Sequence, residues 1–205
     1  MTVHSDCTKA LSRSTTAGIV FTLIAGTLLH FVYDWSQKAF LVSFFSPVNE
    51  STWEHLKLLF VPVFLYSAVE GLILRPCYPD LFRYRAIGCL AGMLALVSFF
   101  YTYSGILGRT FFLFDLLAFF IGVIVTYYLS SFLALKKGQG TTSASKGGHD
   151  GSDSAVGARS HALKKVFPFG KTGYYEGLLI FLILFLFFAI VTWYPPAIGL
   201  FQAPS

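Results

Sequence analysis

Five apolar blocks, separated by polar segments, run along the chain. They cover approximately residues 17–33, 56–74, 86–107, 111–133 and 177–193. A helix of roughly 20 residues crosses the apolar core of a bilayer, and none of the blocks shows the alternation that is typical of strands. The pattern predicts an all-α, polytopic membrane helical bundle with five transmembrane helices.

The polar segments divide the chain into four parts. We expect a cytoplasmic leader over 1–16, a four-helix membrane region over 17–135, a disordered cytoplasmic loop over 136–171, and a fifth membrane helix with a short outer tail over 172–205. The loop is expected to be disordered because its centre, GQGTTSASKGGHDGSDSAVGAR, has too few apolar residues to form a core.

Composition supports the membrane assignment. Of the 205 residues, 55% are hydrophobic and 12% are charged, whereas soluble domains carry about 25% charged residues. Soluble proteins are therefore excluded, although the identity of the membrane stays open. The net charge of +5 comes largely from segments between the spans, so we expect the lipid bilayer as a partner and no nucleic acid.

The basic residues predict an orientation. With five spans, twelve of the fifteen Lys and Arg residues lie on the side of the N-terminus, and the other side holds only Lys38, Lys57 and Arg109. Cytoplasmic loops carry the excess of basic residues. We therefore expect the N-terminus to be cytoplasmic and the C-terminus to lie outside.

The cysteines add a second expectation. This topology places Cys7 and Cys77 on the cytoplasmic side and Cys89 inside a span. Disulfides are rare in the cytosol, so none is expected.

Two local motifs predict how helices begin and pack. Ser51 with Glu54 three residues later matches a capping box, so a helix is expected to start near Asn49. Gly88 and Gly92 lie four residues apart and permit close contact with a neighbouring helix.

Titratable residues gather at the outer end of the predicted bundle. His30 and Asp34 are four residues apart, as are Glu50 and Glu54, so each pair would share a helix face. We expect a polar site there, with candidate catalytic residues His30, Asp34, Glu50 and His55. Its candidate binding residues are Glu54, Arg109, Asp115, Trp35 and Trp53.

The chemistry of this site stays open between three alternatives. His, Asp and Glu side chains suit zinc or another divalent metal, but the tight spacing of a strong zinc motif is missing, so the cofactor is left unknown. The same residues could act as a metal-free acid–base site, or only as ion pairs and helix caps. Arg109 could bind a substrate anion or form a structural pair with Asp115.

At the inner end, Glu70 and Glu176 stand near several basic residues. We expect them to pair with arginines from the set Arg75, Arg83 and Arg85. A proton relay is the alternative.

Four segments resemble a known family of small multipass membrane proteins, domain of unknown function family 6512. They are LLHFVYDWS at 28–36, PVNESTWEHLKLLFVP at 47–62, YTYSGILGRTFFLFDLLAF at 101–119 and WYPPAIGLF at 193–201. The resemblance implies a five-span fold that brings the motif-rich segments together, and it supplies no activity. Family members often have histidine where Arg109 stands, which weakens a metal site that needs that ligand.

The functional expectation is a site for a small polar molecule or lipid headgroup at the non-cytoplasmic end, with acid–base or metal-assisted chemistry. Whether the protein is an enzyme stays open. The alternatives are a transporter or proton-coupled carrier subunit, which with five spans and no repeat would need a homo-oligomer, and a non-catalytic membrane assembly partner.

Overall fold

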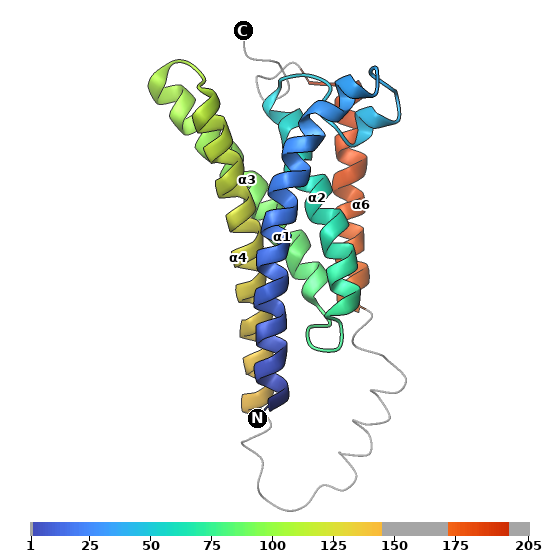
Figure 1. The fold of residues 1–205 in the computed structure, drawn as a ribbon, viewed down its shortest axis with the longest axis vertical. Helices are drawn as coiled ribbons and strands as arrows, with labels where there is room; N and C mark the ends of the chain where they lie inside the picture. Colours follow the sequence, from blue (N-terminus) through green and yellow to red (C-terminus); the bar gives the residue numbers. More distant parts are fainter. Residues whose placement is uncertain (1, 145–171, 197–205) are drawn as a thin grey trace, which may run out of the picture.

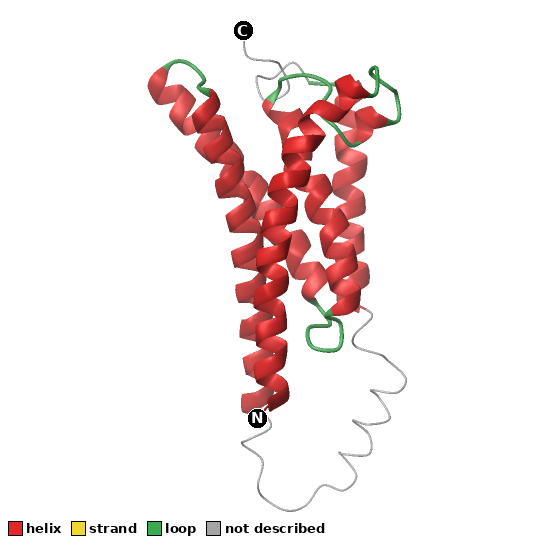
Figure 2. Cartoon of the chain, viewed as in Figure 1, coloured by secondary structure: helices red, strands yellow, loops and turns green. Residues whose placement is uncertain are grey.

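The computed structural model describes residues 2–144 and 172–196. Within them lie five long helices and one short 3-10 helix (Figure 2), and these residues contain no strand. The elements are α1 (Thr2–Trp35), η1 (Val42–Phe44), α2 (Thr52–Ile73), α3 (Leu81–Leu107), α4 (Phe112–Ala144) and α6 (Thr172–Trp193). All five long helices are long and apolar enough to cross a membrane. The predicted all-helical, five-span architecture is confirmed.

Two helices extend beyond the apolar blocks that predicted them. α1 begins at Thr2 and so includes most of the polar leader, and α4 continues past Leu133 to Ala144, into the segment predicted as a loop. The rest of that predicted loop, 145–171, and the end of the tail, 197–205, lie outside the described residues.

α2 occupies the centre of the bundle, where it packs against α1, α3 and α6. α3 and α4 form an antiparallel hairpin with the most extensive helix–helix interface, and the tip of this hairpin leans away from the other helices (Figure 1). The close approach of the two helices needs glycine, because a Cβ at Gly92 would overlap Thr126 and the Gly122 carbonyl.

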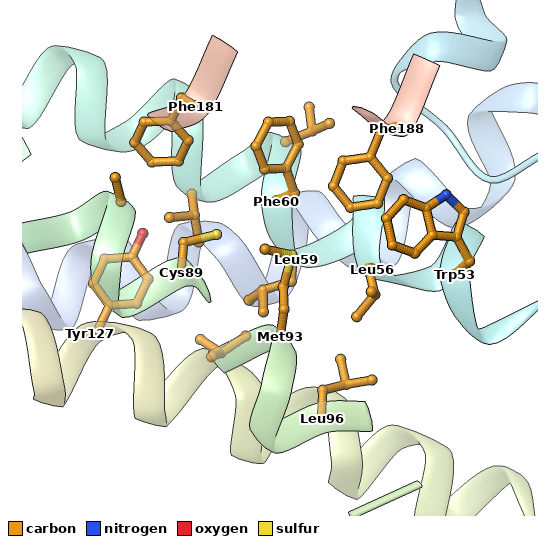
Figure 3. Close-up of a cluster of buried hydrophobic side chains, with 14 of the residues drawn as sticks. Trp53, Leu56, Leu59, Phe60, Cys89, Met93, Leu96, Tyr127, Phe181 and Phe188 are labelled. Atoms are coloured by element: carbon orange, nitrogen blue, oxygen red, sulfur yellow. The ribbon is translucent and has the colours of Figure 1, made fainter. Parts of the chain in front are cut away.

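Aromatic rings fill the space between α2 and α6 (Figure 3). The centroid of the Phe188 ring lies 4.6 Å from that of Trp53 and 5.1 Å from that of Phe60, and Phe60 also contacts Phe181. Such aromatic pairs add to the free energy gained from buried area alone. This cluster fixes α6 against the centre of the bundle.

α2 begins where the capping motif predicts. Ser51 is the N-cap residue, and its hydroxyl oxygen accepts a hydrogen bond from the Glu54 backbone N–H at 3.3 Å. Glu50 therefore precedes the helix.

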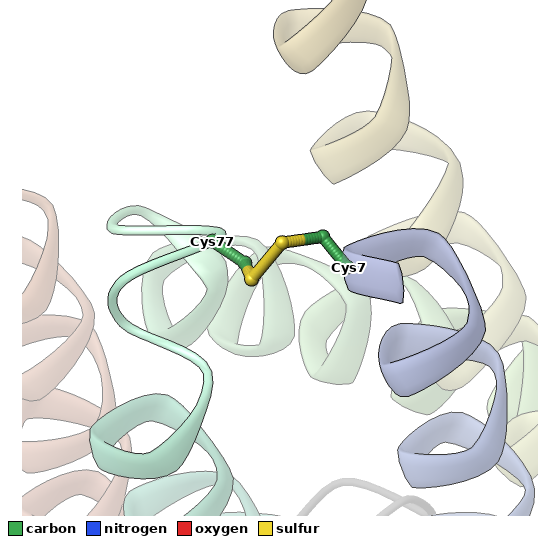
Figure 4. The surroundings of a disulfide bond; sticks show 2 residues. All are labelled: Cys7 and Cys77. Carbon is green, nitrogen blue, oxygen red and sulfur yellow. A yellow bond between two sulfur atoms is a disulfide. The ribbon is translucent and has the colours of Figure 1, made fainter. Parts of the chain in front are cut away.

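The expectation that no disulfide forms is wrong. Cys7 near the start of α1 is bonded to Cys77 in the turn between α2 and α3, with a Cα–Cα distance of 5.8 Å (Figure 4). The prediction was based on a cytoplasmic, reducing location for both cysteines; the leader is helical and brings Cys7 alongside this turn. The orientation that the basic residues predict stays a prediction.

We call the region around this bond the disulfide end: residues 6–15, 70–86, 126–137 and 173–177. The two glutamates of this end pair with arginines as expected, Glu70 with Arg85 and Glu176 with Arg83, each at 2.7 Å. The Arg85 side chain is fully buried.

Candidate functional site

A cavity lies at the opposite end of the bundle, between α2 and the α3–α4 hairpin. We call this region the pocket end: residues 28–55, 100–119 and 188–196. It contains the α1–α2 connection and the end of α6 (Figure 1). The cavity has a volume of about 210 Å³. Its lining residues are Glu50, Thr52, His55, Leu58, Leu96, Phe100, Thr110, Asp115, Ala118 and Phe119.

His55 is held by the start of its own helix. Its Nδ1 lies 2.9 Å from the Ser51 carbonyl oxygen, and because a carbonyl can only accept, Nδ1 carries the proton. In the neutral form of the ring, the lone pair is then on the other nitrogen, Nε2, which lies 3.3 Å from the Glu50 carboxylate. The N-terminal turn of α2 thus directs one lone pair of the imidazole toward the pocket end.

His30 of α1 reaches the same place. Its ring centroid lies 5.3 Å from that of His55. One ligand atom each from His30, Glu50 and His55 lies within 4.8 Å of the others, close enough to hold a metal ion. The structure therefore brings His30 of α1 beside Glu50 and His55 at the start of α2.

Asp115 lies on the opposite wall of the cavity, in the first turn of α4. The hydroxyl of Tyr103, a buried residue of α3, donates a hydrogen bond to its carboxylate. This contact across the hairpin fixes the position of Asp115.

Arg109 does not pair with Asp115 among the residues that the structure describes. It is exposed in the α3–α4 turn, where its guanidinium carbon lies 4.4 Å from the centroid of the Phe111 ring. Arg109 thus makes a cation–π contact with Phe111.

Asp34 and Trp35 lie at the exposed end of α1. Within the described part of the chain, the Asp34 carboxylate makes no hydrogen bond or ion pair. Trp35 stacks on Phe31 with a centroid distance of 5.9 Å and is 68% exposed. Neither residue is part of the cavity lining.

Glu54 and Trp53 belong to the core. The Glu54 carboxylate is buried, forms an ion pair with Lys57 at 2.7 Å and accepts a hydrogen bond from Thr192 of α6 at 2.9 Å. Trp53 packs into the aromatic cluster with α6. Both side chains join α2 to α6, and neither lines the cavity.

Lys57 was not among the predicted site residues, yet it is fully buried. It donates hydrogen bonds to Glu54, to the Ser43 carbonyl and to Thr192. The signal that could have found it is the spacing of three residues between Glu54 and Lys57, which allows an ion pair on one helix face.

An apolar layer separates the two ends of the bundle along α2. Residues 58–63 are all apolar and all buried, between His55 at the pocket end and Glu70 at the disulfide end.

Comparison with known families adds one finding. Residues 4–144 match the model of a family of unknown function (DUF6512). The chain belongs to this family. The match confirms the resemblance to this family, and the DUF6512 region contains the whole cavity lining together with His30. α6, with Thr192, follows the matched region. No curated protein and no solved structure matches the chain.

Proposed function

We propose that the pocket end binds the headgroup of a membrane amphiphile, and that the headgroup carries an amine or hydroxyl donor. The observation that carries the proposal is the lining itself, in which two carboxylates and one imidazole face a cavity with apolar and aromatic walls. A mainly apolar cavity with a few convergent polar groups is typical of small-molecule sites.

The charge of the lining favours a donor over an anion. Glu50 and Asp115 are acidic, and the lining residues that the structure describes include no Lys or Arg. Carboxylates accept charge-assisted hydrogen bonds from amines. An ethanolamine headgroup is therefore a better match than an anionic one.

The apolar walls support a lipid rather than a freely soluble molecule. Leu58, Leu96, Phe100 and Phe119 continue from the polar groups toward the middle of the bundle. A ligand with a polar head and an apolar continuation matches both parts of this lining.

His55 adds a candidate for proton transfer. Its Nδ1 proton is committed to Ser51, and Nε2 can accept a proton from a bound hydroxyl or water. In this proposal Glu50 stabilises the protonated imidazole, from which it lies 3.3 Å away.

The test uses a phosphatidylethanolamine with a photoactivatable group in its acyl chain, incorporated into nanodiscs with the purified protein. Labelling is expected in peptides that line the cavity, and excess phosphatidylethanolamine should compete better than phosphatidylglycerol. Asp115→Asn should reduce labelling about tenfold or more, because a charge-assisted hydrogen bond contributes about 1.5–3 kcal/mol.

The matched control is Glu176→Gln, which neutralises a half-exposed carboxylate at the disulfide end. It should leave labelling unchanged. The fold should survive Asp115→Asn, because the amide oxygen of the substituted side chain can still accept the hydrogen bond from Tyr103. Labelling that is equal in wild type and Asp115→Asn, or that is spread evenly over the helices, would contradict the proposal.

A further inference from the structure

We propose that His30, Glu50 and His55 bind a divalent transition-metal ion of the zinc type. This inference rests on the proposed pocket and adds a cofactor to it. With the metal bound, His55 Nε2 is a ligand, and the proton-transfer role given to it above belongs to the metal-free site. Each of the three residues offers one ligand atom, and these atoms lie within 4.8 Å of one another.

The donor set selects the class of metal. Two imidazole nitrogens and one carboxylate oxygen suit zinc and its first-row neighbours, whereas Ca²⁺ and Mg²⁺ take oxygen ligands. Two histidines and one glutamate form one of the known three-ligand sets of zinc enzymes.

A bound metal would draw the three ligand atoms closer than the 4.8 Å within which they now lie. Bonds of about 2.0–2.1 Å in a tetrahedral site place ligand atoms about 3.4 Å apart. Glu50 Oε2 already lies 3.3 Å from His55 Nε2. The Glu50 side chain is 71% exposed and lies in the connection before α2, so it can adjust without disturbing a helix.

The second nitrogen of His55 provides independent support. Histidines that bind metals generally donate their other N–H to a carbonyl or carboxylate, which orients the ring and selects the tautomer. The Ser51 carbonyl accepts this bond from Nδ1 at 2.9 Å. The lone pair of Nε2 is thereby directed toward Glu50 and His30 before any metal arrives.

Three protein ligands leave a coordination position open. Zinc sites of this kind hold water or substrate in the fourth position. Since Glu50 and His55 also line the cavity, that position would be reached from the pocket, with Asp115 on the facing wall. An amphiphile could then bind the metal through a headgroup oxygen and Asp115 through its amine.

The experiment measures metal binding alone. Protein purified in detergent is stripped with a chelator and titrated with Zn²⁺ against a chromophoric competitor, and Co²⁺ is used as a spectroscopic substitute. Wild type should bind one equivalent and give the visible absorption of a tetrahedral Co²⁺ centre. His30→Ala, Glu50→Gln and His55→Ala should each weaken binding about 100-fold or more, since even the loss of an outer partner costs about 10–100-fold.

The control is Asp34→Asn, which removes an exposed carboxylate one helical turn after His30 and should leave the affinity unchanged. His30→Cys tests folding, because a thiolate is also a zinc ligand and should retain binding. The assignment is overturned if wild type binds no stoichiometric zinc, if the three variants bind as tightly as wild type, or if Asp34→Asn loses as much affinity as His30→Ala.

The two proposals fail separately. Stoichiometric zinc without lipid labelling would leave the metal site standing and remove the amphiphile. Lipid labelling that depends on Asp115, in a protein that binds no zinc, would support the amphiphile site and remove the metal site.

Discussion

At the disulfide end, Arg85 is fully buried and its guanidinium makes two hydrogen bonds of 2.7 Å to Glu70, with further bonds to Thr15 and Ser130. At the pocket end, Glu50 is largely exposed and its close neighbour is His55, whose Nε2 has no other partner among the described residues. The Arg85–Glu70 pair uses its charges inside the protein, whereas Glu50 and His55 leave theirs available, although Glu54 at the same end is buried and paired with Lys57.

The contrast separates the polar residues that stabilise the fold from those that do not. A buried charge is tolerated only when it is paired and hydrogen-bonded, as it is for Arg85 and for Lys57. Groups with unused lone pairs in an accessible cavity stabilise the fold little and are free to bind a ligand. The comparison predicts opposite responses to mutation at the two ends.

The largest expected effect is that of Arg85→Leu. It should lower the free energy of unfolding by about 3–5 kcal/mol, because it leaves the Glu70 carboxylate buried without its partner. Equilibrium unfolding with a denaturing detergent measures the change.

Arg83→Leu is the matched control at the same end. It removes the partner of the half-exposed Glu176 carboxylate, and solvent-exposed pairs contribute only about 0–1 kcal/mol. If Arg85→Leu and Arg83→Leu lowered the free energy of unfolding equally, burial of the Arg85–Glu70 pair would not explain its contribution to stability.

Loss of the disulfide should have a smaller effect. Cys7 and Cys77 are separated by 70 residues, and Cys7→Ser should cost about 2–4 kcal/mol by releasing this loop in the unfolded state. Thermal unfolding in detergent, with and without reductant, measures it.

Reduced wild type should unfold like Cys7→Ser, and the variant should be insensitive to reductant. Cys7→Ser combined with Cys77→Ser should cost no more than either change alone. Full alkylation of Cys7 in native, unreduced protein would contradict the bond.

The smallest effect is expected at the pocket end. Asp34→Asn and Glu50→Gln should each change the free energy of unfolding by no more than about 0.5 kcal/mol, because both carboxylates are exposed. The same unfolding assay applies. If Glu50→Gln lowered the free energy of unfolding as much as Arg85→Leu does, the proposed difference between the two ends would be wrong.

Much of the fold could be predicted because hydropathy acts locally. The five spans follow from apolar block length, the start of α2 from Ser51, and the tight α3–α4 contact from Gly88 and Gly92. The bond from Cys7 to Cys77 could not be predicted in this way. It depends on how far the polar leader continues as a helix and on which residues of other segments then lie beside it.

The sequence predicted most of the residues of the candidate site, but not how they are arranged. His30, Glu50, His55 and Asp115 do gather at one end. Glu54 was grouped with Glu50 by their spacing, but this argument requires both residues on one helix, and Glu50 precedes the N-cap. On α2, Glu54 faces α6 while the adjacent His55 faces the cavity.

The disulfide also changes what a single cut in the backbone does. Residues 36–51 join α1 to α2, and the Cys7–Cys77 bond closes a ring that includes this connection. A protease that nicks the connection would leave two fragments tied by one covalent bond, and the chain would separate on a gel only after reduction. Added to either face of a sealed vesicle, the protease would thus report which side the pocket end occupies, with the reductant-dependent pair of bands as the readout.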